Sequence, residues 1–393
     1  MAEGSTFNSH KEGQNLTSEH LNTMNHMSTK KVTIQELITE CKSRGIKGYS
    51  GLRKAELQAL LEADGNTIQL VGDPIVDPVE ESGSTKKRIA SLFAGCGGLD
   101  YGFFHNNANA YKHVFVNEYD SDACKTYEKN FRVKPLCKDI KTVETIPDCD
   151  LLIGGFPCQG FSMANPYRSV TDERNELYLE ILRLLKLKSP SYFLLENVKG
   201  ILNMGGYATK DDKKAGLGKI MKGILADLAD CGYKVQFKLF DIKQYGVPQK
   251  RQRVIFVGVR NDIAFEPVWP TPTNVIRTLK DAIGDLPLEH DPSIQHIGTL
   301  HKCAVTGYLG NRELAWDEPS PTITGRGGGT GGPVIHNHPS LKRRLTVREC
   351  ARIQTFPDTF TFVGSTSSMY RQLGNAVPCE FAVHLAKIFE SAP

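Results

Sequence analysis

The fold of this chain is decided by the stretch Ile89-Ala90-Ser91-Leu92-Phe93-Ala94-Gly95-Cys96-Gly97-Gly98. A short apolar run, with the length of a buried strand, leads directly into a glycine-rich turn. A strand, a glycine turn and a following helix bring backbone close to a ligand in open α/β sheets. The stretch therefore predicts the first strand of a doubly wound, mostly parallel sheet with a ligand site at its edge.

The alternation of strand and helix continues over residues 87–260 and predicts one large α/β domain. Further buried parallel strands are expected at Val114–Val116, Leu151–Ile153 and Tyr192–Leu195, and helices at Glu173–Leu187 and Leu217–Ala229. Val235–Phe240 and Val254–Val259 are expected to form a terminal pair of strands.

Beyond Arg260 the periodicity fades, and residues 261–343 predict a smaller, irregular region rich in proline and glycine. Regular helices return in residues 344–393. There, Thr346 and Glu349 have the spacing of a capping box, and the last helix is expected after Pro378. We expect this C-terminal part to complete the large domain.

The segment before the large domain divides into three parts. Residues 1–28 are polar throughout and predict a disordered tail, and residues 66–86, with two Asp-Pro pairs, predict a linker. Between them, residues 29–65 predict two short helices. Thr33 and Glu36 would cap the first, and Leu57, Leu60 and Leu61 share one face of the second.

Composition and cysteine spacing argue against a secreted, membrane-spanning or metal-containing protein. The 393 residues carry 48 Lys and Arg against 44 Asp and Glu, so any basic surface must be local. The polar N-terminus argues against a signal peptide, and no apolar run is long enough to span a membrane. None of the ten cysteines has CxxC spacing, which argues against a structural metal site. We expect a soluble intracellular protein with free thiols and no metal.

Two acidic residues follow expected strands. Glu118 stands at the end of the second strand, where a carboxylate can accept hydrogen bonds from ribose hydroxyls. Asp139 ends the next probable strand and could accept from an adenine amino group. Together with the glycine turn, they predict a nucleotide-like cofactor.

A cysteine and a further acid occupy two other strand ends. Cys158 follows Phe156 and Pro157, at a position that favours the nucleophilic thiolate. Glu196 ends the apolar run Tyr192–Leu195, where an acid is costly to bury without a purpose. Adjacent parallel strands would bring both side chains to one rim of the sheet.

Five motifs then carry a family resemblance. They are Gly155-Phe156-Pro157-Cys158-Gln159, Glu196-Asn197-Val198, Gln249-Lys250-Arg251-Gln252-Arg253, Arg344-Leu345-Thr346-Val347-Arg348-Glu349 and Gln372-Leu373-Gly374-Asn375-Ala376-Val377-Pro378. In this order, the set resembles the cytosine-5 DNA methyltransferases. The resemblance runs from about Arg88 to the C-terminus.

The resemblance implies a Rossmann-like fold that uses S-adenosylmethionine, without a metal, to methylate carbon 5 of a flipped-out cytosine in double-stranded DNA. Cys158 would form a covalent bond to the base and Glu196 would contact ring nitrogen 3. Arg251 and Arg253 would hold the base carbonyl and the cysteine loop. By the same resemblance, the cofactor pocket would be lined by Phe93, Gly95, Gly98, Glu118, Asp139, Ile140, Asn375 and Val377.

The resemblance also assigns the remaining parts of the chain. The segment 261–343 corresponds to the target-recognition region, with Thr322-Ile323 as its short fixed element. Residues 29–65 resemble the SAP motif, a helical DNA-binding module, although a helical hairpin for protein contacts remains an alternative. We expect a monomer that reads one target sequence. A cognate restriction endonuclease is left open as a partner.

Two other functions stay open at this point. One is an RNA cytosine methyltransferase, although the Cys-Phe-Thr signature of the family's transfer-RNA branch is absent from the sequence. The other is a non-catalytic DNA-binding protein on the same scaffold, against which the intact Cys158, Glu196, Arg251 and Arg253 argue.

Overall fold

The computed structural model describes residues 33–43, 54, 57, 86–105, 110–156, 176–273, 275–298, 314–325, 337–341 and 343–393. They belong to two compact units, Met1–Ile75 and Val76–Pro393. In the first unit, helix α1 (Ile34–Ser43) buries Leu37 and Cys41, and Leu57 is buried as well. The first predicted helix is therefore present, whereas Leu60 and Leu61 of the second lie outside the described residues.

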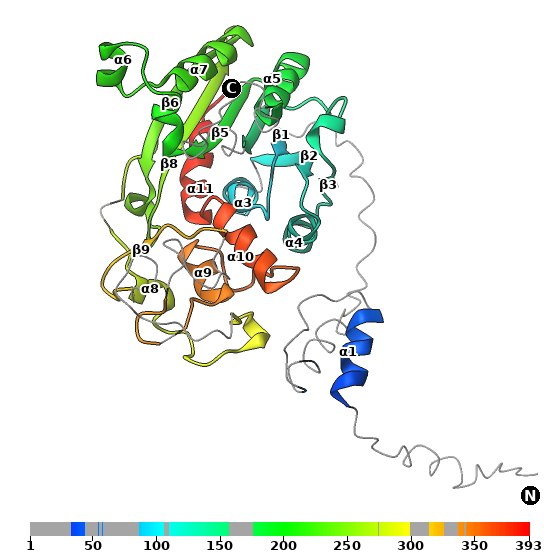
Figure 1. The fold of residues 1–393 in the computed structure, drawn as a ribbon. Coiled ribbons are helices and arrows are strands. Elements are labelled where there is room, and N and C mark those ends of the chain that lie inside the picture. The colour runs from blue at the N-terminus through cyan, green and yellow to red at the C-terminus, as the bar shows by residue number, and fades with distance from the viewer. Residues whose placement is uncertain are drawn as a thin grey trace, which may run out of the picture. The chain divides into compact units, whose positions relative to one another are not determined.

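Seven strands of the second unit form one sheet in the order β3-β2-β1-β4-β5-β8-β6 (Figure 1). They are β1 (Lys87–Leu92), β2 (Tyr111–Glu118), β3 (Leu136–Cys137), β4 (Leu151–Gly155), β5 (Tyr192–Val198), β6 (Tyr233–Asp241) and β8 (Gln252–Arg260). The pairings from β3 to β5 are parallel, and β8 runs antiparallel to both β5 and β6. This confirms the predicted mostly parallel sheet and its terminal pair of strands.

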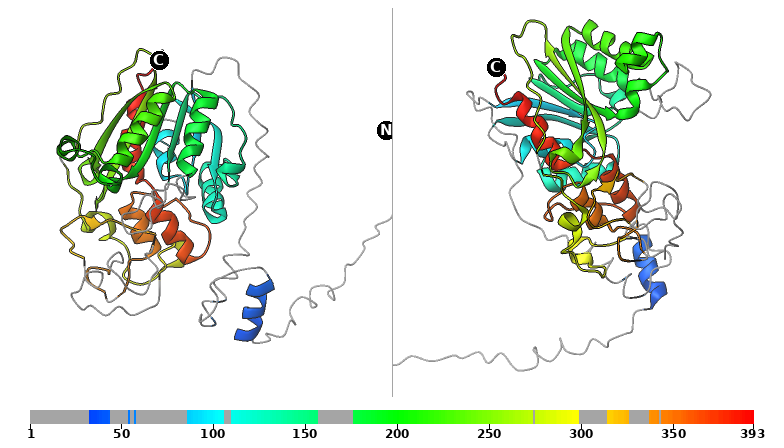
Figure 2. Two further views of the ribbon diagram at one scale, coloured as in Figure 1. Left: turned by 45° about the horizontal axis from the view of Figure 1, so that its top comes forward. Right: turned by 90° about the vertical axis from the view of Figure 1, so that its left-hand side faces the viewer.

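Helices cover both faces of the sheet because successive residues of the buried strands point to opposite sides. Ile89 and Leu151 face α3 (Gly98–Phe104) and α11 (Cys379–Ala386). Ala90 and Leu152 face α5 (Glu176–Lys188) and α7 (Lys219–Asp230). Figure 2 shows α11 on one side of the sheet and α5 and α7 on the other. The predicted α/β architecture is therefore doubly wound.

A third apolar cluster lies at one end of the sheet and includes residues of α8 (Leu279–Ile283), α9 (Val347–Ile353) and α10 (Thr366–Asn375) (Figure 1). The predicted capping box starts α9: Glu349 N donates to Thr346 Oγ1 at 3.2 Å, and Thr346 N donates to the Glu349 carboxylate at 2.7 Å. The helix predicted after Pro378 is α11.

The remaining elements are the helix α4 (Ser121–Phe131) and a set of short helices and strands. The short elements are α6 (Lys210–Ala215), the parallel strands β7 (Gln249–Lys250) and β9 (Ser320–Pro321), and the 3-10 helices η1 (Ile140–Thr142), η3 (Lys199–Asn203), η4 (Ile242–Tyr245), η5 (Pro292–Ile294) and η6 (Lys387–Phe389). Within the described ranges, no helix combines the length and apolar character that crossing a membrane requires.

Candidate active site

The glycine turn after β1 exposes backbone to open space. Gly95 (φ 57°) and Gly97 (φ 91°) adopt left-handed conformations that favour glycine. Phe93 also has a positive φ of 53°, which costs a bulky residue about 1–2 kcal/mol. A Cβ added at Gly95 would meet no atom within 4 Å. The turn therefore leaves room beside its backbone for a ligand.

Glu118, at the end of β2, is tied to this turn. Its Oε2 accepts a hydrogen bond from Gly95 N at 2.8 Å, and its Oε1 accepts one from Asp120 N at 2.7 Å. Burial raises the pKa of Glu118, and the two backbone donors act in the opposite direction. Each carboxylate oxygen still has acceptor capacity for a ligand hydroxyl.

Asp139 and Ile140 occupy the next strand end, after β3. Asp139 caps η1, where its Oδ1 accepts from Lys141 N at 3.0 Å, so the other carboxylate oxygen remains available for a ligand. Ile140 is only 2% exposed and packs into the core behind η1. Its side chain therefore supports the site more than it faces a ligand.

The residues that follow α10 pack against the glycine turn. A methyl group added at Gly98 would overlap the carbonyl oxygen of Val377, so these two predicted cofactor residues contact each other. Val377 is 7% exposed, whereas Asn375, the last residue of α10, is exposed. Of these three residues, only the Asn375 side chain is free to reach a ligand.

Cys158 lies outside the described residues, as does the loop Gly160–Arg174 that follows it. The chain that leads to Cys158 is nevertheless placed as far as Phe156, whose carbonyl accepts from Asn197 Nδ2 at 3.1 Å. Gly155 pairs in register with Glu196 across the parallel strands β4 and β5. The end of β4 and Glu196 therefore share one rim of the sheet.

Glu196 forms an ion pair with Arg253 from the neighbouring antiparallel strand β8. Oε1 of Glu196 lies 2.6 Å from Nε of Arg253, and the two side chains are 13% and 12% exposed. Arg253 Nη1 also donates to the carbonyl of Gln252 at 2.8 Å. The pair presents a carboxylate and a guanidinium side by side, an arrangement that can recognise a planar ring with donor and acceptor groups.

Arg251 is placed differently from Arg253. It is 1% exposed, and its guanidinium donates to the carbonyls of Ile323 (3.1 Å), Gly374 (3.2 Å) and Ala376 (3.1 Å). Burial, with no acid in hydrogen-bonding contact among the described residues, lowers its pKa. Its Nε has no hydrogen-bond partner within the described part of the chain. The contacts thus make Arg251 a clamp between backbone segments, and its predicted contact with the base or cysteine loop stays a prediction.

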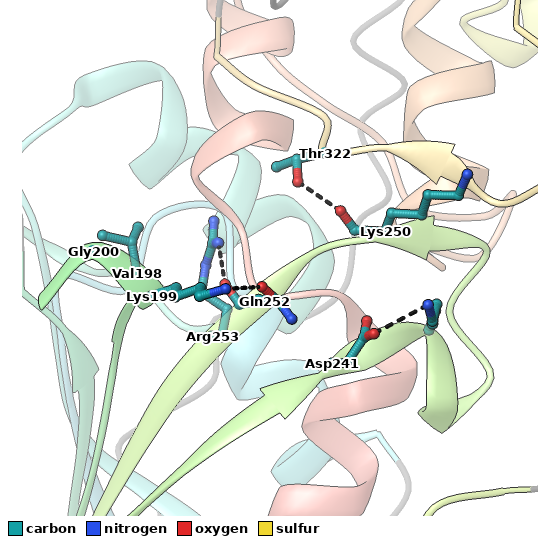
Figure 3. Close-up of a pocket in the computed structure, with 9 residues that line it drawn as sticks. Val198, Lys199, Gly200, Asp241, Lys250, Gln252, Arg253 and Thr322 are labelled. Carbon is teal, nitrogen blue, oxygen red and sulfur yellow. Dashed lines mark hydrogen bonds and ion pairs between the residues drawn. The ribbon is translucent and has the colours of Figure 1, made fainter. Parts of the chain in front are cut away.

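A polar pocket of about 500 Å³ opens beside the Glu196–Arg253 pair. Figure 3 shows that it lies between the ends of β5, β6 and β8 and the segment of Thr322. Its lining residues are Val198, Lys199, Gly200, Asp241, Lys243, Lys250, Gln252, Arg253 and Thr322. Four of these are cationic, but Lys243, Lys250 and Arg253 form ion pairs with Asp241, Glu318 and Glu196. Lys199 donates to Gln252 Oε1 at 2.9 Å, so an anionic ligand would meet it without competing against a carboxylate partner among the described residues.

Residues 87–390 match the family model of the C-5 cytosine-specific DNA methylases. The chain belongs to this family. The assignment confirms the prediction of a DNA cytosine-5 methyltransferase, which family and fold together link to S-adenosylmethionine as co-substrate. The match begins at residue 87, so the SAP-like motif stays a prediction.

Known relatives of this methyltransferase are type II enzymes. M.BsuRI of Bacillus subtilis is 36% identical over 361 residues, which cover 77% of this chain and 78% of that protein. M.MthTI of Methanothermobacter thermautotrophicus is 37% identical over 332 residues, which cover 76% of this chain and 96% of that protein.

Solved structures show the same fold at lower identity. The methyltransferase EhMeth of Entamoeba histolytica superimposes with a TM-score of 0.59 at 20% identity, covering 78% of this chain and 98% of that chain. The Dnmt2 methyltransferase of S. pombe gives a TM-score of 0.58 at 21% identity, covering 78% and 99%. These matches establish the fold of the methyltransferase domain.

Three further residues at the site of this methyltransferase were not among those predicted from the sequence. Tyr119 follows Glu118 and is 76% exposed, which is unusual for a large aromatic at a strand end. Lys199 and Lys243 line the pocket. Tyr119 directly follows the predicted cofactor residue Glu118, and Lys199 directly follows the motif Glu196-Asn197-Val198, so adjacency was the available signal.

Proposed function

We propose that this protein is a sequence-specific methyltransferase that methylates a flipped-out cytosine in double-stranded DNA through a covalent bond to Cys158. The observation that carries the proposal is the Glu196–Arg253 pair, which lies at the rim where β4 ends, three residues before Cys158. A cytosine in that position would have to leave the base stack, because enzymes that act on a ring atom extrude the base.

The proposed chemistry begins at Cys158. Its thiolate would attack carbon 6 of the ring, which makes carbon 5 nucleophilic enough to accept a methyl group. Glu196, in its protonated form, would donate to ring nitrogen 3, and Arg253 would donate to the ring carbonyl, so that both offset the negative charge that builds on the ring. Loss of the carbon 5 proton to a base then expels the cysteine and restores the ring.

S-adenosylmethionine supplies the methyl group when bound, and the strand ends fit its nucleoside. Glu118 and Asp139 offer acceptors for ribose hydroxyls and an adenine amino group, and the exposed ring of Tyr119 suits stacking on a base. Gly95 leaves the space that the turn would need for such a ligand. Asn375 would reach the same ligand from α10.

The partners follow from this activity. Double-stranded DNA is the substrate, with Thr322 and the rest of residues 261–343 as the region that reads the target. Because known relatives are type II methyltransferases, a cognate restriction endonuclease is the proposed functional partner. We propose an intracellular monomer in which residues 29–65 provide an additional DNA contact.

The test is bisulfite sequencing of a plasmid expressed with the wild-type protein or with the Cys158→Ser variant. Protection of one short sequence by the wild type alone would establish the activity, the nucleophile and the target. Absence of protected cytosines with both proteins, despite binding of S-adenosylmethionine, would instead favour an RNA substrate or a non-catalytic role.

A further inference from the structure

In the short element Thr322-Ile323, both backbone polar groups of Ile323 are hydrogen-bonded to buried side chains. The N–H of Ile323 donates to Gln249 Oε1 at 3.0 Å, and the carbonyl of Ile323 accepts from Arg251 Nη1 at 3.1 Å. Gln249 and Arg251 are two positions apart in the same motif and are at most 1% exposed. Two buried side chains therefore fix the backbone that places Thr322 in the polar pocket.

The same side chains also reach the last turn of α10. Arg251 donates to the carbonyls of Gly374 and Ala376, as described above. Gln249 Nε2 donates to Gln354 Oε1 at 2.8 Å, and Gln354 Nε2 in turn donates to the carbonyls of Ala376, at 3.2 Å, and Leu373. Gln354 is fully buried at the C-terminal end of α9.

Backbone packing extends this arrangement in both directions. It reaches from Thr322-Ile323, the target-recognition element, to the glycine turn after β1, the cofactor turn. A methyl group added at Gly374 would overlap the backbone at Thr324 and Gly325. On the far side, Val377 contacts Gly98 of the glycine turn. The Ile323 segment cannot shift against α10 without breaking the buried hydrogen bonds of Gln249 and Arg251, each of which is costly to leave unmade. The glycine turn is held to the residues after α10 by the close packing of Gly98 on Val377.

We propose that Gln249, Arg251 and Gln354 form a polar bracket that couples the cofactor turn to the target-recognition element. Gln354 is then a positioning residue for methyl transfer, although it touches neither substrate. A cofactor that orders Asn375 would also order the neighbouring carbonyls of Gly374 and Ala376, which accept hydrogen bonds from the bracket. Thr322 would then be in position before DNA binds. The inference rests on the proposed function, because it assumes that Asn375 faces the cofactor and Thr322 the DNA.

The experiment measures how strongly DNA tightens binding of S-adenosylhomocysteine, the stable product, to the full-length protein. Calorimetric titrations without and with a plasmid that the wild type methylates give two dissociation constants for S-adenosylhomocysteine. Their ratio is the coupling factor, which we expect to be at least about fivefold for the wild type. Gln354→Met keeps the volume of the side chain but removes its hydrogen bonds within the bracket. Gln249→Met breaks the bracket at Ile323 instead, and serves if Gln354→Met does not fold.

The matched control is Gln295→Met. Gln295 makes two hydrogen bonds to the backbone of Phe362, a residue of the third apolar cluster, at 2.7 and 2.8 Å. These bonds involve neither of the two coupled segments. We expect all three variants to lose thermal stability, but only the two bracket variants to lose the coupling, with the factor falling towards one.

Two results would overturn the bracket. One is a wild-type factor of one, and the other is a factor that stays at the wild-type value in both folded bracket variants. A wild-type protein that methylates no plasmid cytosine would contradict the proposed function instead, and the two failures are therefore distinguishable.

Discussion

Glu196 and Arg253 form an ion pair across β5 and β8, with 2.6 Å between Oε1 and Nε, although the two residues are 57 positions apart in the chain. Both side chains are mostly buried, so each is the principal charge partner of the other. A pair of this kind is pre-ordered before any base arrives. This favours catalysis, because charge stabilisation in the reaction then requires little reorganisation.

The first prediction concerns Glu196. Replacement by Gln keeps the shape of the side chain but removes the carboxyl group that would transfer a proton, so the rate of methyl transfer should fall by about 10²–10⁴-fold. Binding of S-adenosylhomocysteine should not change. Transfer of labelled methyl groups to plasmid DNA measures the effect. Glu180→Gln, which breaks an Arg183 ion pair on α5, is the control. Wild-type turnover in Glu196→Gln would remove this residue from the proposed chemistry.

The second prediction concerns Glu118. Gln at this position would turn an amide nitrogen or a weaker acceptor towards the backbone donors of Gly95 and Asp120. Loss of one charged hydrogen bond of about 1.5 kcal/mol or more should weaken S-adenosylmethionine binding at least tenfold. Calorimetry checks this, with Asp148→Asn, an exposed acid that pairs with Lys188, as the control. Equal affinities would place the cofactor elsewhere.

Much of this architecture was predictable because it depends on local patterns. Short apolar runs predicted the parallel strands. The motifs that contain Glu196 and Arg253 identified these two residues as candidates for the site. The placement of Arg251 could not be predicted in the same way. Its partners are backbone carbonyls of Ile323, Gly374 and Ala376, and a carbonyl leaves no trace in residue identity.

Gly98 illustrates the same limit. The family resemblance implies that Gly98 contacts the cofactor, and the structure shows that it also packs against the carbonyl of Val377. Both explanations require a residue without a side chain, so the sequence pattern is identical for either. The packing of the C-terminal segment against the turn shows the Val377 contact, and the cofactor contact stays a prediction.

The third prediction concerns the polar pocket. If Lys199 and Lys243 bind DNA phosphates, the double variant Lys199→Gln/Lys243→Gln should reduce the slope of log affinity against log salt by roughly 0.9 for each phosphate that is no longer neutralised. Fluorescence anisotropy with a labelled duplex over a salt series measures the slope. Lys213→Gln/Lys214→Gln, on the short helix α6, removes the same charge elsewhere. Parallel slopes for the two double variants would show that the pocket does not bind phosphate.

The fourth prediction concerns Asp100, which is fully buried in α3 behind the glycine turn. It accepts hydrogen bonds from Tyr127 Oη at 2.7 Å and Ser91 Oγ at 3.1 Å, and burial raises its pKa from 3.8 to about 6. The folded protein therefore keeps this proton up to about pH 6, whereas the unfolded chain loses it near pH 4. Stability from Asp100 is fully present below pH 4 and is lost as the pH rises through 6.

The difference between these two pKa values corresponds to roughly 3 kcal/mol of unfolding free energy. Urea unfolding of the wild type and of Asp100→Asn between pH 4 and pH 7 tests this, since the stability difference between them should change by that amount. His113, which contacts Tyr127 at 2.8 Å and whose pKa burial lowers to about 3, has the opposite pH dependence. It is present in both proteins, so its contribution largely cancels in the difference. A stability difference that is independent of pH would mean that Asp100 is ionised in the folded protein throughout this range.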